Sequence, residues 1–504
     1  MRLAAIDVGS NSVHMIVADA SRDGHLEVVD RVKEMVRLGR RSFMTGRLTD
    51  ESMDLAVGAL KHFGRLARVR RVDRMRAVAT SAVREAKNRI AFIRRIRRET
   101  GIAVEVISGA EEARLIFKAA QHAFGLDGGP HLLVDVGGGS VELVLVRDGR
   151  PLWMHSAKLG VARLTERFLT DDPPSNAQLR KLEAHLENKI GAVLRKARKA
   201  RVVQAIGTSG TINTLVAMAR ASRGEEIGRL HGASASADEI SRLANDLVTA
   251  NSALRAELPG MDAKRVDLMP SAGALVDFIL RKSGAPTLVA CSWALREGLI
   301  LSLLKTARGS SAADARRRSV KALAARFAGA NEHGRQVAKL ALRLFDATAP
   351  VLGLPKSSRE LLEYAALLHD VGHAIDHDRH NRHSYYLIKN AELFGFEPDE
   401  IEVIAQAARG HRKQAPKVDS PDLSALTGPR RRLVRGFAAI LRVADALDRT
   451  HFGVVKNIEV SYTPGRLIIG VDTNREKADL ELWTCERRTD LLSRLVDRQV
   501  ILAR

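Results

Sequence analysis

Residues 3–19 read LAAIDVGSNSVHMIVAD, and residues 131–146 read HLLVDVGGGSVELVLV. Each stretch has an apolar run that ends in Asp, a short turn rich in Gly or Ser, and a second apolar run, so each predicts strand, turn, strand. When Asp7 is aligned with Asp135, five of the seven positions from Asp7 to Val13 are identical to those from Asp135 to Val141. This internal similarity predicts two related half-domains that open on the same hairpin.

Alternating strand and helix patterns follow each hairpin. After the first we expect a strand at 26–34, a helix near 50–69, a strand at 75–80, a helix near 88–99, a strand at 103–107 and a helix near 110–124. After the second we expect a long helical insertion at roughly 209–285, then a strand at 286–291 and a helix from Trp293. Strands that alternate with helices are typical of an α/β fold.

The character of the sequence changes from about residue 306, where the pattern becomes all-helical with clustered histidines up to about residue 455. In the final stretch, NIEVSYTP and RLIIGVDT predict a hairpin, ADLELWTC (478–485) predicts a strand, and a helix is expected from Arg487. A chain of 504 residues exceeds the size at which one hydrophobic core keeps growing. We therefore predict half-domains at 1–128 and 129–305, a helical domain at 306–455 and a small α/β domain at 456–504.

The composition is that of a globular protein, with 45% hydrophobic and 28% charged residues. No apolar run reaches 18 residues, so no transmembrane helix and no membrane partner are expected. The opening residues MRLAAIDVGSNS lack the long apolar stretch of a signal peptide. The two cysteines, Cys291 and Cys485, lie far apart without metal-ligand spacing. A cytoplasmic protein is the expectation.

The chain is strongly basic, with 81 Lys and Arg against 59 Asp and Glu, a net charge of +22. Such a surplus favours anionic partners, although a solvated basic surface is an equal alternative. Aromatic residues make up only 4% of the chain, so stacking platforms for nucleic acid are scarce. Because no nucleic-acid motif is recognisable either, no specific nucleic-acid partner is expected.

The two Gly-rich turns are candidate phosphate cradles, because a residue without Cβ lets backbone N–H groups approach a phosphate closely. Asp7 and Asp135, each at the end of a first strand, would place a carboxylate beside that phosphate, where Mg²⁺ would sit. A plain hairpin turn is the alternative, but two homologous turns that face each other favour the phosphate interpretation. The candidate phosphate-binding residues are Gly9, Ser10, Asn11 and Ser12 in the first turn, and Gly137, Gly138, Gly139 and Ser140 in the second.

Five segments occur in an order that resembles the exopolyphosphatase and guanosine pentaphosphate phosphatase (Ppx/GppA) family: DVGSNSVHMIVAD, VATSAVREAKN, ISGAEEARLIF, LLVDVGGGSVELV and AIGTSGT. They span residues 4–211, and the helical region 306–455 is similar to the family as well. The resemblance implies a duplicated actin-like (ribonuclease H-like) ATPase fold, followed by an all-α HD-like domain and a small α/β domain. It also implies Mg²⁺-dependent hydrolysis of terminal phosphates.

The resemblance also assigns roles to particular residues. Glu112 matches the family's general base, and Arg84 matches an arginine that clamps substrate phosphate. Asp135 and Glu142 match its metal site. Spacing separates Glu112 from its neighbour, because Ser108 and Glu111 have the spacing of a capping box and would hold Glu111 at the helix start. The structural alternatives are a solvated helix residue for Glu112 and an outward-facing strand residue for Glu142.

A third loop, Gly207-Thr208-Ser209, follows the strand VVQAI and corresponds in actin-like proteins to a loop beside the nucleotide or substrate tail. Its backbone and hydroxyl donors could bind a phosphate there, with a simple strand-to-helix turn as the alternative.

The helical region carries a second set of ligand-type residues that resembles the HD-domain metal phosphohydrolase pattern. Imidazole and carboxylate are suitable ligands for Mn²⁺, Fe²⁺ or Zn²⁺, so a transition metal is a candidate second cofactor. The alternative is a helical scaffold whose His-Asp pair makes structural hydrogen bonds only. The candidate ligands are His333, His369, Asp370, His383, His411 and Asp445.

Taken with the charge, these features predict an exopolyphosphatase that releases orthophosphate from inorganic polyphosphate, with guanosine pentaphosphate (pppGpp) as the alternative substrate. A non-hydrolytic actin-like ATP-binding or assembly protein is a less favoured hypothesis, because the glutamate of EEAR argues for hydrolysis. The expected assembly is a homodimer.

Overall fold

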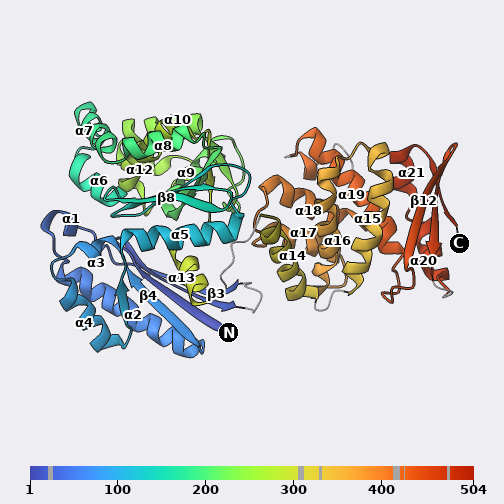
Figure 1. The fold of residues 1–504 in the computed structure, drawn as a ribbon, viewed down its shortest axis with the longest axis horizontal. Helices are drawn as coiled ribbons and strands as arrows, with labels where there is room; N and C mark the ends of the chain where they lie inside the picture. Colours follow the sequence, from blue (N-terminus) through green and yellow to red (C-terminus); the bar gives the residue numbers. More distant parts are fainter. Residues whose placement is uncertain are drawn as a thin grey trace. The chain divides into compact units, whose positions relative to one another are not determined.

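The computed structural model describes residues 1–20, 26–304, 312–328, 332–412, 421–424, 426–473 and 477–503. The chain forms two compact units, Met1–Ala315 and Arg316–Arg504. Figure 1 shows the first unit in blue to green, with its last helix in yellow-green, and the second in yellow to red. Within the described part of the chain, none of the helices combines the length and the hydropathy needed to span a membrane.

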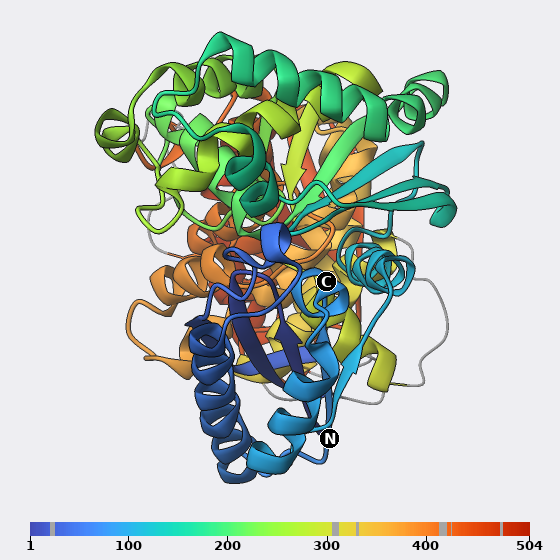
Figure 2. The ribbon, with the colours of Figure 1, turned by 90° about the vertical axis from the view of Figure 1, so that its left-hand side faces the viewer.

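The first sheet of the first unit has the strand order β3-β2-β1-β4-β5. Strands β1, β2 and β3 are antiparallel neighbours, whereas β4 and β5 run parallel to β1. Helix α2 lies alongside this sheet in both views (Figures 1 and 2) and contacts β2, β3 and α4. The strands are β1 (Arg2–Val8), β2 (Ser12–Ala20), β3 (Leu26–Met35), β4 (Arg74–Ala79) and β5 (Val104–Val106), and the helices are α1 (Ser42–Thr45), α2 (Asp50–Val69), α3 (Ser81–Glu85) and α4 (Arg89–Thr100).

The second sheet repeats this plan, with the order β10-β11-β9-β6-β7-β8. Its core β8-β7-β6-β9-β11 has the same sequence of antiparallel and parallel pairings as the first sheet, and β10 is an added antiparallel edge strand. The repeat confirms the predicted duplicated, actin-like fold. The strands are β6 (His131–Val136), β7 (Val141–Arg147), β8 (Arg150–Ala157), β9 (Gln204–Thr208), β10 (Ser234–Ser236) and β11 (Thr287–Ala290).

The insertion predicted at 209–285 is mainly helical, as expected, but it also supplies the edge strand β10, which the sequence pattern did not reveal. Its helices are α9 (Ser209–Ser222), α10 (Ala237–Thr249), α11 (Ser252–Glu257) and α12 (Met269–Ser283). Three further helices, α6 (Val161–Phe168), α7 (Asn176–Leu186) and α8 (Ala192–Lys199), precede β9.

Two equivalent helices, α5 (Gly109–Phe124) and α13 (Leu295–Leu303), follow the last parallel strands of the two sheets and contact each other. Helix α5 lies between the sheets (Figure 1), where it packs against β7 and β8, while α13 packs against β1, β2 and β4. A Cβ at Gly298 would lie 2.1 Å from the backbone oxygen of Leu115, so only glycine allows the two helices to approach this closely. The crossing brings the first turns of both helices to the same central region.

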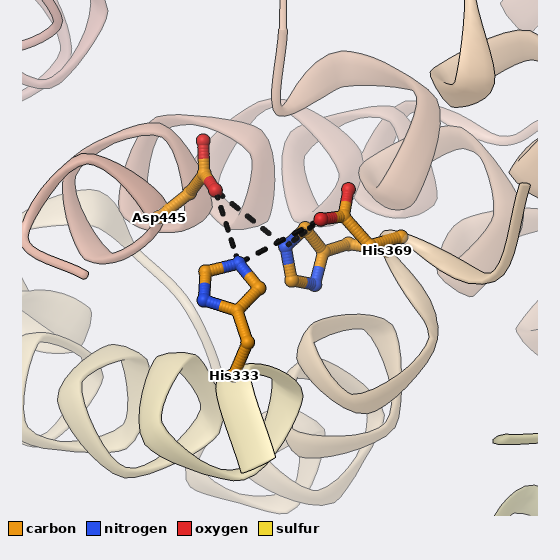
Figure 3. A group of neighbouring side chains, drawn as sticks. His333, His369 and Asp445 are labelled. Carbon is orange, nitrogen blue, oxygen red and sulfur yellow. Dashed lines mark ion pairs between the residues drawn. The ribbon is translucent and has the colours of Figure 1, made fainter. Parts of the chain in front are cut away.

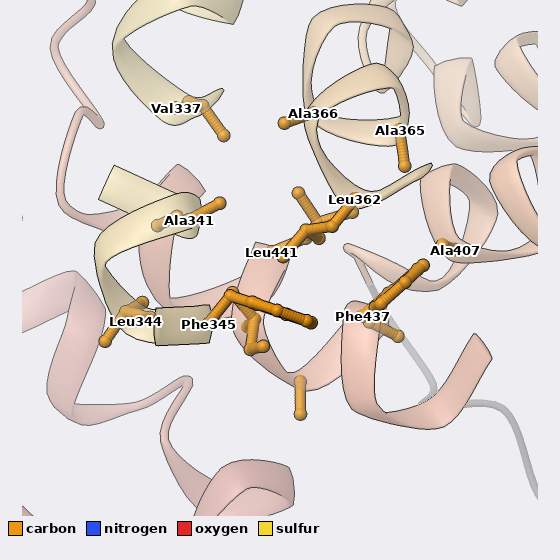
Figure 4. Packing of buried hydrophobic residues seen from close by; sticks show 14 of the residues in the cluster. Val337, Ala341, Leu344, Phe345, Leu362, Ala365, Ala366, Ala407, Phe437 and Leu441 are labelled. Carbon is orange, nitrogen blue, oxygen red and sulfur yellow. The ribbon is translucent and has the colours of Figure 1, made fainter. Parts of the chain in front are cut away.

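The second unit is a helical bundle whose core continues into a small α/β segment. The rings of Phe345 and Phe437 meet edge-on at 6.3 Å between centroids, among buried aliphatic residues such as Leu362 and Leu441 (Figure 4). The same core includes Leu492 of the final segment. The helices are α14 (Ala312–Ala328), α15 (Glu332–Leu352), α16 (Arg359–Leu368), α17 (His380–Asn390), α18 (Pro398–Gly410) and α19 (Gly428–Ala446).

The final segment differs from the prediction in one element. β12 (Asn457–Thr463) and β13 (Arg466–Asp472) form the predicted hairpin, but the predicted strand ADLELWTC is helix α20 (Asp479–Glu486). Ala478, Glu481 and Cys485 are buried, which is the spacing of a helix face rather than a strand face. The third strand of the sheet is instead β14 (Gln499–Ala503), which pairs parallel to β13 after helix α21 (Asp490–Val496).

Candidate active site

The two Gly-rich turns form a facing pair in the first unit. In each, a glycine N–H donates to a serine carbonyl oxygen, Gly9 to Ser12 at 3.1 Å and Gly137 to Ser140 at 3.0 Å. A Cβ at Gly138 would lie 3.2 Å from the Cβ of Ser10, so the turns lie against each other. They line a cavity of about 170 Å³. The predicted phosphate-binding residues of both turns border it: Gly9, Ser10, Asn11, Ser12, Gly137, Gly138, Gly139 and Ser140.

The third predicted loop contributes unequally to this cavity. Ser209 borders it at the start of α9, together with the next two residues of that helix. The unpaired N–H groups of a helix N-terminus favour an anion, so α9 adds donors for a phosphate. Thr208 is buried and donates its hydroxyl to Oδ1 of Asp135, whereas Gly207 packs against Ile212 and does not border the cavity.

Four carboxylates surround the facing turns. Asp7, Glu112 and Asp135 border the cavity, and Glu142, the cross-strand partner of Asp135, is 1% exposed beside them. Oε1 of Glu142 accepts from the hydroxyl of Ser156 at 2.8 Å. Oε2 of Glu142 and Oδ1 of Asp7 are buried with no hydrogen-bond partner among the residues that the structure describes.

Burial and repulsion between neighbouring carboxylates raise the pKa of these groups. Burial, opposed by Arg296 and reinforced by Asp135, raises the pKa of Asp7 to about 7. Burial also raises the pKa of Glu112 to about 7, and it raises the pKa of Asp135 and Glu142. An oxygen-ligated cation would relieve this repulsion and partner the orphaned oxygens, so the donor set fits Mg²⁺.

The geometry of the candidate metal ligands fits an ion that takes only part of its coordination shell from protein side chains. Within the described ranges, no three carboxylates or imidazoles of the cavity bring ligand atoms within 4.8 Å of one another. Mg²⁺ in phosphoryl-transfer sites characteristically uses one or two carboxylates and completes its shell with water and substrate phosphate. Asp135 and Glu142, on paired strands, are the residues that would hold it, with Asp7 opposite.

Glu112 is positioned by Arg84, whose Nη1 lies 3.0 Å from its Oε2 and donates also to the carbonyl oxygen of Ile107 at 2.9 Å. Arg84 therefore points to Glu112 and does not border the cavity. The neighbouring Glu111 faces away and accepts two hydrogen bonds from Arg114, at 2.7 and 2.8 Å. The two glutamates thus occupy different helix faces, as expected.

The predicted capping box at the start of α5 is only half present. The hydroxyl of Ser108 accepts from the N–H of Glu111 at 3.1 Å, as a capping box requires. The carboxylate of Glu111, however, is taken by Arg114 instead of reaching back to Ser108, because an ion pair one turn along the helix is within easy reach.

The most important residue missed from the sequence is Arg296, in the first turn of α13. Its Nη1 lies 2.8 Å from Nδ1 of His14, and burial together with this cation lowers the pKa of His14 to about 2. His14 pairs across its hairpin with Asp7 just as Glu142 pairs with Asp135. Equivalent hairpin positions of the two halves therefore carry a carboxylate in one half, Glu142, and an imidazole held by Arg296 in the other, His14.

Thr80, Ser81 and Arg265 also border the cavity and were not predicted from the sequence. Thr80 and Ser81 directly follow β4, and Thr208 and Ser209 stand at the end of the equivalent β9 and the start of α9, so comparing VATS with IGTS across the repeat would have found them. Arg265 also borders the cavity and lies close to Gly210, where a Cβ would come within 2.0 Å of its Nη2. Arg265 lies in a loop without a local pattern, so sequence periodicity gives no signal for it.

A second pocket, of about 740 Å³, lies within the second unit and brings together most of the predicted histidine and aspartate ligands. Nε2 of His333 and Nε2 of His369 each lie 3.6 Å from Oδ2 of Asp370, and 3.4 and 3.6 Å from Oδ1 of Asp445. Figure 3 shows the two imidazoles and the carboxylate of Asp445 converging from α15, the end of α16 and α19. The four groups have the spacing of a metal site.

Asp370 also faces a second group of histidines through its other side. Its Oδ1 lies 3.2 Å from Nε2 of His380 and 3.5 Å from Nε2 of His411, and its Oδ2 lies 3.5 Å from Nε2 of His373. Of the predicted ligands, His383 does not border this pocket; His380, one turn earlier on α17, points into it instead. Neither His380 nor His373 was predicted.

His333, His369 and His411 are held with Nε2 directed at the carboxylates, because the Nδ1 of each has a partner of its own. Nδ1 of His333 lies 2.8 Å from Asp448, that of His369 lies 2.7 Å from the carbonyl oxygen of Ala366, and that of His411 lies 2.5 Å from another carbonyl oxygen. Such outer contacts orient imidazole ligands in metal sites. Burial alone would lower the pKa of His333, but the adjacent aspartates raise it to about 9.

Comparison with known proteins identifies a family and relatives that match this chain. The sequence model of the Ppx/GppA phosphatase family matches residues 16–307, and that of Ppx/GppA phosphatase, domain III, matches residues 315–479. Exopolyphosphatase 1 of Mycobacterium leprae is 32% identical over 308 residues, which are 60% of this chain and 90% of that protein. Exopolyphosphatase 1 of Mycobacterium tuberculosis is 32% identical over 60% of this chain and 88% of its own length.

Two solved structures agree with the sequence matches. An exopolyphosphatase from Cytophaga hutchinsonii superposes with a TM-score of 0.57 at 30% identity, covering 62% of this chain and 100% of that one. The Aquifex aeolicus Ppx/GppA family member superposes with a TM-score of 0.53 at 30% identity, covering 60% of this chain and 97% of that one.

Proposed function

Because the chain belongs to the Ppx/GppA phosphatase family, and is therefore a hydrolase, we propose that it releases terminal orthophosphate from inorganic polyphosphate at the cavity between its two Gly-rich turns. The observation that carries the proposal is the placement of Glu112. It is 6% exposed, borders the cavity and is held by Arg84. Its pKa of about 7 suits a group that must accept a proton near neutral pH.

The reaction that this geometry supports is in-line displacement by water. Glu112 orients the water and accepts one of its protons as the new oxygen–phosphorus bond forms. The anhydride bond to the penultimate phosphate breaks, and its oxygen stays on the shortened chain. Backbone N–H groups of both turns and of the start of α9 hold the phosphate oxygens in position. When bound beside Asp135 and Glu142, Mg²⁺ supplies neutralisation of the negative charge on the phosphoryl group.

Two arginines extend the anion-binding character of the cavity. Arg296 and Arg265 border it and could pair with phosphates further along the substrate, because guanidinium groups bind phosphate oxygens in a fixed fork. In the structure Arg84 donates a hydrogen bond to the carboxylate of Glu112. We propose that it turns to the terminal phosphate once substrate is bound, which keeps its predicted role as a phosphate clamp.

Guanosine pentaphosphate is the second candidate substrate. Polyphosphate is favoured because the net charge of +22 suits a long polyanion and because the matched mycobacterial proteins are named exopolyphosphatases. The test is to compare phosphate release per enzyme from long-chain polyphosphate and from pppGpp at equal concentrations of phosphoanhydride ends. A higher kcat/KM for pppGpp would replace polyphosphate as the main substrate.

A cytoplasmic location and a homodimeric assembly remain predictions from the sequence. Light scattering of the purified chain would test the assembly directly.

A further inference from the structure

Helix α6 begins directly against the second Gly-rich turn. Gly160 precedes the helix, and a Cβ at this position would lie 2.2 Å from the backbone nitrogen of Gly139. No side chain can come so close to a backbone atom, so only glycine allows the helix to start here. The first residues of α6 therefore lie within hydrogen-bond reach of the turn that borders the cavity.

The carbonyl groups of the three glycines in this turn accept hydrogen bonds from α6. The oxygen of Gly137 accepts from the N–H of Val161 at 3.0 Å, and that of Gly138 accepts from the N–H of Arg163 at 3.2 Å. The oxygen of Gly139 accepts from Nε of the Arg163 side chain at 3.0 Å. In a planar trans peptide the N–H of the next residue points opposite to the carbonyl. The three N–H groups that follow these carbonyls belong to residues that border the cavity, and they therefore point away from α6.

The equivalent carbonyl of the first turn is held by main chain instead. Asn11 stands in the first hairpin where Gly139 stands in the second, and its oxygen accepts from the backbone N–H groups of Val36 and Arg37, at 3.1 and 2.9 Å. At Gly139 the donor is the Arg163 side chain. The orientation of the second turn therefore depends on one side chain at the place where the first turn depends on backbone.

Arg163 also binds residues of the first half-domain. Its Nη2 donates to Oε1 of Glu85 at 2.7 Å, and the same oxygen accepts from the hydroxyl of Ser81, which borders the cavity, at 3.0 Å. The guanidinium carbon lies 4.1 Å from the centroid of the Phe43 ring. The Arg163 and Glu85 side chains are 14% and 22% exposed, so their ion pair is screened by solvent and salt less than a surface pair. One guanidinium thus connects the second turn to the first half-domain.

The Phe43 ring packs against glycines of both half-domains. A Cβ at Gly139 would lie 2.5 Å from its Cζ, and a Cβ at Gly39 would lie 2.7 Å from its Cε2. The guanidinium of Arg163 is therefore surrounded by an aromatic ring, a carboxylate and a carbonyl oxygen, which are groups that bind a planar cation with several N–H donors. A guanidinium ion from solution would fit the space left if this side chain were shortened.

We propose that Arg163 is a positioning residue of the phosphate site, which holds the Gly139 peptide so that the N–H of Ser140 points to the substrate, and which couples this orientation to Glu85 and Phe43 of the first half-domain. The inference rests on the proposed hydrolysis of polyphosphate at this cavity. Arg163 does not border the cavity, so it acts through the turn and does not contact substrate. Donors must be oriented before the reaction to stabilise the transition state, so a turn that is free to rotate loses affinity and rate.

The test compares variants of the full-length chain in phosphate release from polyphosphate at saturating Mg²⁺. Arg163→Ala should lower kcat/KM on the order of 10²-fold, because the turn is no longer held. Arg163→Lys keeps the charge, but one ammonium group does not reproduce the fork that reaches both Gly139 and Glu85, so it should lose most of the activity as well. Arg167→Ala is the matched control, because Arg167 lies one turn along α6, is exposed and does not border the cavity. Parent-like activity in Arg163→Ala or Arg163→Lys would overturn the inference.

A second measurement separates positioning from a general loss of structure. Guanidinium chloride at millimolar concentration, far below the molar range that unfolds proteins, is added to each variant, with sodium chloride at the same ionic strength as the reference. Guanidinium should raise the kcat/KM of Arg163→Ala on the order of 10-fold by occupying the vacated space between Glu85, Phe43 and Gly139, and it should leave Arg167→Ala unchanged. A merely destabilised protein would gain nothing from a denaturant. No rescue of a folded Arg163→Ala would contradict the positioning role.

Binding of tripolyphosphate, measured by calorimetry in the Glu112→Gln background, tests Arg163 without turnover. Adding Arg163→Ala should weaken this binding on the order of 10-fold, because an aligned N–H donor is lost. A parent chain that releases no phosphate from polyphosphate would refute the proposed function and leave this comparison intact, whereas equal affinities with and without Arg163 would refute the positioning role alone. Circular dichroism establishes folding, and Arg163→Lys carries the activity and binding comparisons if Arg163→Ala does not fold.

Discussion

Replacing Asp7 by Asn should make the metal-free protein more stable while removing most of its stabilisation by Mg²⁺. The reason is that Asp7 ionises at a cost in the folded state, with a pKa raised from 3.8 to about 7 by burial and neighbouring carboxylates. The unfolded chain releases this proton near pH 3.8 and the folded chain only near pH 7. The ionisation of Asp7 therefore leaves stability intact below about pH 3.8 and reduces it progressively as the pH rises to about 7.

The size of the effect on stability follows from the pKa shift of Asp7. About 3 pKa units at 1.36 kcal/mol each give about 4 kcal/mol of destabilisation at pH 8, an upper bound because the residue is only partly buried. An amide in its place removes that penalty but leaves a polar group with an incomplete set of partners, at about 1–3 kcal/mol. We expect the free energy of unfolding of Asp7→Asn to exceed that of the parent by about 1–3 kcal/mol at pH 8 in EDTA, and by little or nothing at pH 4.

The assay is calorimetric unfolding in EDTA and in saturating Mg²⁺, with Asp246→Asn, at an exposed position on α10, as the control. Mg²⁺ at 100 times its Kd should stabilise the parent by about 2.7 kcal/mol and Asp7→Asn by less. The reasoning is refuted if Asp7→Asn loses stability in EDTA at pH 8 as much as at pH 4, or if Mg²⁺ stabilises it as much as it does the parent.

Three further outcomes follow from the same geometry. Asp135→Asn and Glu142→Gln should each raise the Mg²⁺ concentration needed for half-maximal phosphate release, and an unchanged requirement in both would remove these residues from the metal site. Arg296→Gln should raise the KM for polyphosphate on the order of 10-fold with a smaller change in kcat, because a cation beside the substrate path is lost. His231 accepts from the N–H of Ser292 at 3.2 Å, and the burial of its ring lowers its pKa to about 3. Its contribution to stability is therefore present above pH 6.5 and lost as the pH falls to about 3. His231→Asn should flatten this part of the stability curve of the first unit, measured by chemical denaturation, and an identical slope in variant and parent would contradict the assignment.

The repeated hairpins could be read from the sequence because a duplicated strand-turn-strand leaves identical residues at matched positions. The same comparison, carried further along the repeat, would have located Thr80 and Ser81 from Thr208 and Ser209. Arg296 is the second residue of α13, whereas Glu112 is the fourth residue of α5. The comparison therefore gives no signal for Arg296, because the two charged residues do not match when the two helices are aligned at their starts.

In two other places the local sequence pattern does not determine the structure. The segment 478–485 alternates enough apolar residues to suggest a strand, yet Leu480 and Trp483 are exposed and burial follows a helical period, which only the packing against α19 decides. In the helical unit, the residue types of the second site were evident, but its histidines lie on one short stretch where His373, His380 and His383 are all candidates. His380 and His383 both lie on α17, so which of these two faces Asp370 depends on the phase of that helix, and the sequence does not fix that phase.

The most direct test of the account is phosphate release from polyphosphate by Glu112→Gln and Glu111→Gln, measured side by side with the parent at saturating Mg²⁺. Gln keeps the shape of Glu but cannot accept the proton of the attacking water. We expect Glu112→Gln to lose activity on the order of 10²- to 10⁴-fold while still binding polyphosphate. Glu111→Gln, which alters ion pairs with Arg114 and Arg76 outside the cavity, should remain close to the parent. An active Glu112→Gln beside an inactive Glu111→Gln would contradict the assignment of the general base and, with it, the proposed mechanism.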